Sequence, residues 1–81
     1  MNREDVANEI TKLLLQIKQD PNLSISRDMD ICSSSFGLTV ADVAYFFLML
    51  EKKFHVDLDS ILDDINRFTI NEISDAVIHQ Q

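Results

Sequence analysis

The residues best suited to metal chemistry are a group of acidic side chains and a pair of histidines. The acidic group crowds one short stretch and consists of Asp57, Asp59, Asp63 and Asp64. A calcium-binding EF-hand loop needs a central glycine and a closing glutamate, and this stretch has neither. His55 and His79 lie far apart in the chain and do not form the spacing of a zinc motif. We therefore expect a solvated acidic surface and no metal ion.

Nucleophilic catalysis is the other chemistry that the residue types would permit. Cys32 is the only cysteine, so it cannot form an internal disulfide. Cys32, His55 and an aspartate can be drawn as a catalytic set, but no motif in the chain activates the thiol. The only glycine is Gly37, which excludes a glycine-rich phosphate loop. The sequence therefore predicts a protein that is not an enzyme.

Length and composition restrict the fold and the partners. The 81 residues predict one domain, 1–81, that buries only about 60 to 65% of its unfolded surface. Hydrophobic residues make up 46% of the chain, with one glycine and one proline, which favours long helices. The net charge of −7 opposes binding to nucleic acid or to an anionic membrane. No apolar run approaches the roughly 20 residues of a membrane span, and the first residues lack a secretory signal, so we expect a cytoplasmic protein.

Apolar periodicity predicts a first helix from about residue 3 to residue 19. The spacing of Asn2 and Asp5 predicts a capping pair, and Pro21 ends the pattern. Apolar residues then recur at helical spacing: Val6, Ile10, Leu13, Leu14 and Ile17. Residues 20–38 lack periodicity but contain scattered apolar side chains. We expect them to form a long loop that is pinned to the core.

Capping pairs mark the remaining helices. Thr39 and Asp42 have the [ST]-x-x-[DE] spacing that predicts a second helix from about Val40 to Phe54. Residues 55–58 read as extended, and Asp59 is expected to cap a short helix over residues 60–64.

Thr69 and Glu72 form the third capping pair, ahead of the last helix. The sequence thus predicts an all-α fold of four helices, three long and one short. The loop after the first helix is the longest connection.

The second helix and the residues before it resemble the centre of an acyl carrier protein. Residues 37–41 read Gly-Leu-Thr-Val-Ala, and residues 50–54 read Leu-Glu-Lys-Lys-Phe. In the family, Gly-x-Asp-Ser-Leu opens the second helix and Leu-Glu-x-x-Phe closes it, with no gap needed here. Residues 69–73, Thr-Ile-Asn-Glu-Ile, look like the Thr-Val-x-Asp-Ala that precedes the last helix of the family. The resemblance implies a small four-helix bundle of acyl-carrier type with a long first loop.

The same resemblance removes the usual cofactor. In this register Thr39 falls on the aspartate of the family and Val40 on the serine that carries phosphopantetheine. Valine has no oxygen to phosphorylate, so we expect no cofactor. The alternative is a genuine acyl or peptidyl carrier that is modified on Ser35 or on Thr39. Ser35 lies five residues before the expected position, and the Thr39 oxygen is expected to cap the helix.

The second helix has more apolar residues than the core can bury, because a helix of a small bundle buries only part of its circumference. The residues that suffice for the core are Val43, Phe46, Phe47, Leu50 and Phe54. Ala44, Tyr45, Leu48 and Met49 remain, and exposed residues of this kind usually mark a partner surface. The expected partner-binding residues are Asp42, Tyr45, Leu48, Met49 and Lys52. Cover by the long loop or by the third helix is the alternative that stays open.

The resemblance extends to one narrower group. Residues 41–45, Ala-Asp-Val-Ala-Tyr, with the Leu-Glu-Lys-Lys-Phe that follows, are similar to acyl carrier-related proteins of bacterial peptide-maturation systems, which also lack the serine. The expected function is a non-catalytic docking or adaptor module for enzymes of a biosynthetic or peptide-maturation system. The competing functions are the genuine carrier and a small helical regulatory or dimerisation subunit. We expect a monomer or a weak homodimer.

Overall fold

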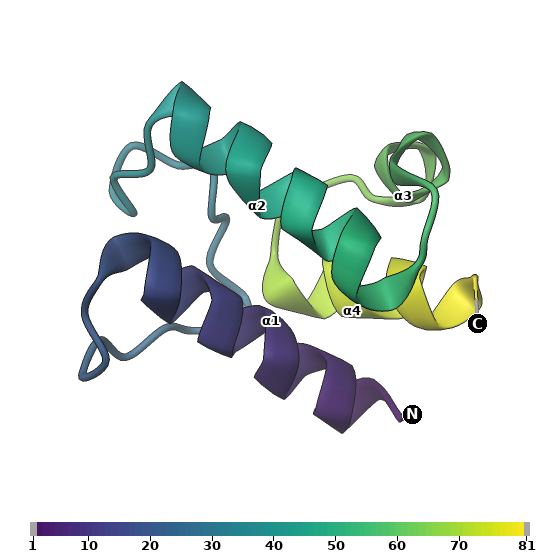
Figure 1. The fold of residues 1–81 in the computed structure, drawn as a ribbon, viewed down its shortest axis with the longest axis horizontal. Helices are drawn as coiled ribbons and strands as arrows, with labels where there is room; N and C mark the ends of the chain where they lie inside the picture. The colour runs from purple at the N-terminus through teal and green to yellow at the C-terminus, as the bar shows by residue number, and fades with distance from the viewer. Residues whose placement is uncertain (1, 81) are drawn as a thin grey trace.

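The computed structural model describes residues 2–80, which form four helices joined by loops (Figure 1). They are α1 (Arg3–Lys18), α2 (Val40–Phe54), α3 (Leu58–Asp64) and α4 (Ile70–His79). α1 packs against both α2 and α4, and α3 packs against α4. In the described part of the chain, the only β-type pairing is an isolated bridge between Asp30 and Thr69. The prediction of three long helices and one short helix is confirmed.

α1 begins and ends where its sequence signals lie. The Asn2 side chain accepts a hydrogen bond from the Asp5 backbone N–H at 2.9 Å, which satisfies one of the free donors of the first turn. At the other end, Gln19 adopts a left-handed conformation with φ 57°, two residues before Pro21. None of the helices in residues 2–80 is both long enough and apolar enough to cross a membrane.

The core lies between α1, α2 and α4. Its largest fully buried apolar side chains are Val6, Ile10, Leu14, Ile31, Phe46, Leu50, Ile61, Ile70, Ile73 and Val77. The Phe47 ring contacts Phe46 edge-on at a centroid distance of 5.1 Å and Phe68 at 5.8 Å. Such aromatic pairs add stability beyond the area that they bury. The inner side of α2 is therefore fixed by its aromatic residues.

The long connection between α1 and α2 has no helix but is attached to the core at several points. Ile31 and Phe36 are buried, and the Ile31 backbone N–H donates to the Phe68 carbonyl oxygen at 2.9 Å. The Lys18 Nζ donates to the Phe36 carbonyl oxygen at 2.7 Å. The prediction of a long loop that is pinned to the core is confirmed. These contacts hold the segment that leads into α2.

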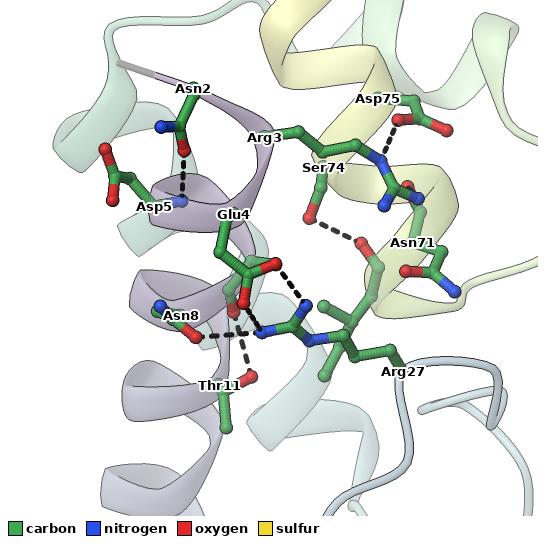
Figure 2. Close-up of polar contacts among 12 residues, drawn as sticks. Asn2, Arg3, Glu4, Asp5, Asn8, Thr11, Arg27, Asn71, Ser74 and Asp75 are labelled. Atoms are coloured by element: carbon green, nitrogen blue, oxygen red, sulfur yellow. Dashed lines mark hydrogen bonds and ion pairs between the residues drawn. The ribbon is translucent and has the colours of Figure 1, made fainter.

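A second attachment joins the long loop to α1 through Arg27 (Figure 2). Its guanidinium group donates to both carboxylate oxygens of Glu4, at 2.7 and 2.8 Å, and to the side-chain oxygen of Asn8 at 2.8 Å. The hydrogen bond and the positive charge of Arg27 lower the pKa of Glu4. The pairing is bidentate, which gives it a defined geometry.

The start of α3 differs from the prediction. We expected Asp59 to cap a helix over residues 60–64, but α3 spans Leu58–Asp64, with Asp57 at the N-cap position and Asp59 in the first turn. The cause is a contact with the end of α4. The Asp57 backbone N–H donates to the Gln80 side-chain oxygen at 2.8 Å, and the Gln80 side-chain amide donates to the Asp57 carbonyl oxygen at 3.0 Å. This contact fixes Asp57 as the residue from which the helix starts.

Candidate functional site

The start of α2 is held by a reciprocal pair of hydrogen bonds. The Thr39 hydroxyl accepts from the Asp42 backbone N–H at 3.0 Å, and the Asp42 carboxylate accepts from the Thr39 backbone N–H at 3.1 Å. This is the capping box that the spacing predicts, and it places Val40 as the first residue of the helix. The predicted start of the second helix is confirmed.

Val40 projects from this start into solvent. The residue is 89% exposed, and Ala41 beside it is also exposed. Nothing in the fold requires an apolar residue here, because Val40 contributes almost no buried surface. A hydroxyl at this position would be open to an enzyme, whereas valine offers no nucleophile. The exposure of Val40 at the helix start and its lack of a hydroxyl are therefore the observations that bear on whether a cofactor is attached here.

The two hydroxyls expected as alternative attachment points lie in different settings. Thr39 is exposed, but its oxygen is engaged with the Asp42 backbone N–H. Ser35 is exposed in the turns that precede α2. The Ser33 hydroxyl, by contrast, is buried and has no hydrogen-bond partner among residues 2–80. Modification of Ser35 or Thr39 stays a prediction.

The outer side of α2 carries an exposed apolar surface. The inner side of the helix is packed against the core by four buried residues, Phe46, Phe47, Leu50 and Phe54, and by the half-buried Val43. Five apolar residues remain exposed at helical spacing, and we call them the α2 face: Val40, Ala41, Ala44, Tyr45 and Leu48. Tyr45 is 52% exposed and Leu48 is 49% exposed. A cluster of this kind is a candidate contact surface.

The structure does not bring all five expected partner-binding residues to this surface. Tyr45 and Leu48 belong to the α2 face, whereas the Asp42 carboxylate is engaged in the capping box. Met49 is half-buried against the core, and it faces α1 together with Lys52. The candidate residues are therefore divided between two surfaces of the helix.

The second surface is a groove between α1 and α2 with a volume of about 360 Å³. We call it the α1–α2 groove, and it is lined by Glu9, Lys12, Leu13, Gln16, Met49, Lys52 and Lys53. The Glu9 carboxylate contacts the Lys53 Nζ at 2.9 Å and the Lys12 Nζ at 3.5 Å. The hydrogen bond with Lys53, followed by the charge of Lys12, lowers the pKa of Glu9. The sequence did not predict the groove. Glu9 and Lys12 are close along the chain, but nothing in the sequence shows that residues of α2 lie beside them.

Two observations bear on the residues weighed for catalysis and for metal binding. Partial burial, followed by the charge of Asp30, raises the pKa of the Cys32 thiol, which is the opposite of what activates a nucleophile. Across residues 2–80, no group of three or more His, Cys, Asp or Glu side chains is arranged to hold a metal ion. The aspartates at positions 57, 59, 63 and 64 are exposed.

Comparisons of the chain with protein-family models, with curated proteins and with solved structures find no significant match. The observations that bear on function are therefore the start of α2, the α2 face and the α1–α2 groove.

Proposed function

We propose that this protein is a docking module of acyl-carrier-protein type that carries no phosphopantetheine. Its partner is an enzyme of a biosynthetic or peptide-maturation system. The observation that carries the proposal is the position of Val40, the first residue of a capped α2 and 89% exposed. In the acyl-carrier register this is the place of the modified serine. The chain presents the geometry of an attachment point without the atom that attachment needs.

The helical arrangement supports the same proposal. The capping box at Thr39, the long pinned loop before it and the short α3 after α2 agree with what the resemblance implies. Thr69 accepts from the Glu72 backbone N–H at 3.1 Å, so the motif before the last helix also has its expected role as a cap. These features support the register in which Val40 falls on the serine position.

The α2 face supplies the contact surface of the proposed module. Tyr45 and Leu48 lie on successive turns of one helix side and are about half exposed. A tyrosine beside an aliphatic residue is a typical anchor in protein interfaces. The face begins at Val40, so an enzyme bound there would meet the start of α2. The proposed module therefore binds through side chains and not through an attached arm.

The test is affinity capture from an extract of the source cells, with the bound proteins identified by mass spectrometry. Wild type is compared with the double variant Tyr45→Ser and Leu48→Gln. The matched control is Leu62→Ser, which replaces another exposed leucine, 40% exposed on α3. Thermal melts of all three proteins confirm that the fold is retained.

We expect wild type and the Leu62→Ser control to retain the same biosynthetic or peptide-modifying enzyme. The double variant should lose it, because truncation of each interface anchor commonly weakens binding by about tenfold or more. The proposal is overturned if no such enzyme is retained. It is also overturned if the double variant retains the enzyme as well as wild type does.

A further inference from the structure

The α1–α2 groove is a basic site on an acidic protein. The chain has a net charge of −7, yet three of its seven Lys and Arg residues line this groove beside a single carboxylate, that of Glu9. The other basic side chains contact groups elsewhere: Arg3 with Asp75, Lys18 with the Phe36 carbonyl, Arg27 with Glu4, and Arg67 with the Asp28 carbonyl. The groove is thus the one place in the described chain where positive charge gathers in excess.

The groove combines this charge with an apolar floor. Leu13 is buried and Met49 is half-buried, and both belong to its lining. Lys52 has no ion-pair partner within the described residues, and the Lys12 side chain is 70% exposed. An occupant that matches these features has an apolar side chain flanked by carboxylates.

α3 of the same chain has that chemistry. Asp59, Leu62 and Asp63 are spaced i, i+3 and i+4, so they share one side of the helix, and all three are exposed. Neither Asp59 nor Asp63 has a cation within ion-pair distance in residues 2–80. We call these three residues the α3 acidic face.

The α3 acidic face is also electrostatically unfavourable in a single molecule. Carboxylates at i and i+4 repel each other on a helix. Acidic residues in the last turn oppose the helix dipole, and this turn contains Asp63 and Asp64 with no basic residue. At the helix start the Asp57 carboxylate accepts the Ser60 hydroxyl at 2.9 Å but no backbone N–H of the first turn, and these contacts supply no positive charge to the last turn. Cations from another molecule would therefore stabilise α3.

We propose that the α1–α2 groove binds the α3 acidic face of a second copy of this chain. Leu62 of one copy packs between Leu13 and Met49 of the next. Asp59 and Asp63 then face Lys52, which has no ion-pair partner within the described residues, and Lys12, whose exposed ammonium group contacts Glu9 only at 3.5 Å. The groove is lined by α1 and α2 only, so the α3 of its own copy does not fill it.

This inference goes beyond the proposed function, because it concerns a surface other than the α2 face. We place one groove–α3 contact between each pair of copies, which makes the interface heterologous, whereas a two-fold pair would make the contact twice and close as a dimer. After the first contact, one copy still has a free groove and the other still has a free α3. Association can therefore continue into a ring or an open chain. A contact made by one leucine and a few ion pairs belongs to the small, weak class of interfaces.

The net charge of −7 opposes association at long range but not at the contact. At physiological ionic strength the Debye length is about 8 Å, so charges further apart are largely screened. Ion pairs in direct contact are screened less. The experiment is therefore carried out at physiological salt.

Sedimentation equilibrium over a wide range of protein concentration measures the association. The wild-type average mass should rise with concentration past that of a dimer. A groove variant, Lys12→Gln with Lys52→Gln, and an α3 variant, Leu62→Ser with Asp63→Asn, should each stay monomeric. All four positions are exposed, so thermal melts should show that both variants fold.

Mixing the two variants gives the sharpest result. The groove variant still has an intact α3, and the α3 variant still has an intact groove. Their mixture should form a one-to-one heterodimer and grow no further, because the remaining groove and the remaining α3 are both altered. A two-fold pair that makes the contact twice would stop at a dimer in wild type, so growth of wild type past a dimer distinguishes it from the proposed arrangement.

Two control variants test whether the loss of association is specific to the groove and to α3. Arg3→Gln with Arg67→Gln removes the same number of positive charges outside the groove and should self-associate like wild type. Tyr45→Ser with Leu48→Gln alters the α2 face and should also self-associate like wild type. Loss of association in this second control would place the interface on the α2 face and overturn the proposal.

A wild-type chain that stays monomeric at all concentrations overturns the proposal. In that case a synthetic helical peptide with the Asp-x-x-Leu-Asp pattern of α3 shows whether the groove accepts an acidic segment of another protein. Absence of a heterodimer in the mixture also overturns it. The capture experiment on the α2 face is independent of these outcomes.

Discussion

The capping box at the start of α2 should stabilise the protein more than the exposure of Thr39 would suggest. Its hydroxyl satisfies the Asp42 backbone N–H at 3.0 Å. Thr39→Ala leaves that donor without its partner, and loss of an N-cap costs about 0.5 to 2 kcal/mol. With an unfolding entropy of about 2.1 cal/mol/K per residue, a domain of this length loses about 6 °C of melting temperature per kcal/mol. We therefore expect a decrease of about 3 to 12 °C.

Thermal unfolding followed by circular dichroism measures this change. Thr39→Asp should melt at the wild-type temperature or above it, because a carboxylate also caps and interacts favourably with the helix dipole. Thr11→Ala is the matched control. Its hydroxyl donates to the Ala7 carbonyl within α1 at 2.8 Å, and alanine is the better helix former there. If Thr39→Ala melts like wild type, α2 does not depend on this cap, and the register that places Val40 at the attachment position loses its support.

Three further predictions concern acid stability, the α2 face and the thiol. The pKa of Glu4 is lowered in the folded protein, so the stability that it contributes is present above its unfolded pKa and is lost as the pH falls through its folded pKa. Glu4→Gln should flatten the fall in stability below about pH 4 in urea titrations, and an unchanged pH profile would contradict a role for the Arg27 pairing. Tyr45→Ser should change the free energy of unfolding by less than about 1 kcal/mol, whereas Phe46→Ala should cost about 3 to 5 kcal/mol, and similar losses for both would place Tyr45 in the core. Because the pKa of Cys32 is raised, its alkylation by iodoacetamide at neutral pH should be slower than that of a free cysteine, and a faster reaction would contradict the assigned environment.

Much of the fold follows from local signals. Asn2, Thr39 and Thr69 each precede an apolar periodic run, and each side chain accepts a backbone hydrogen bond in the first turn of a helix. These signals are local because a capping residue and its donor lie within three positions of each other. The aromatic inner side of α2 was predictable for the same reason, since periodicity alone defines the two sides of a helix.

The features that were missed depend on contacts between distant parts of the chain. Gln80 fixes the start of α3 by bonding both backbone groups of Asp57, and nothing near Asp57 predicts this. The groove brings together distant parts of the chain, since Lys53 on α2 contacts Glu9 on α1 at 2.9 Å. Periodicity places the apolar Met49 on the surface of the helix, but it does not show that α1 packs beside it. The division of the candidate residues between two surfaces therefore required the structure.

Modification by a phosphopantetheinyl transferase tests the assignment of Val40 most directly. Wild type and the double variant Thr39→Asp with Val40→Ser are incubated with the transferase and coenzyme A, beside a genuine acyl carrier protein as positive control, and intact masses are measured. We expect no mass change for wild type and the gain of one phosphopantetheine group for the double variant, whose helix start then has both the acidic cap and the hydroxyl. A mass gain on wild type would contradict the account, and Ser35→Ala and Thr39→Ala would then identify the oxygen that is used. If the double variant gains no mass while the positive control is fully modified, the placement of Val40 at the attachment position is also contradicted.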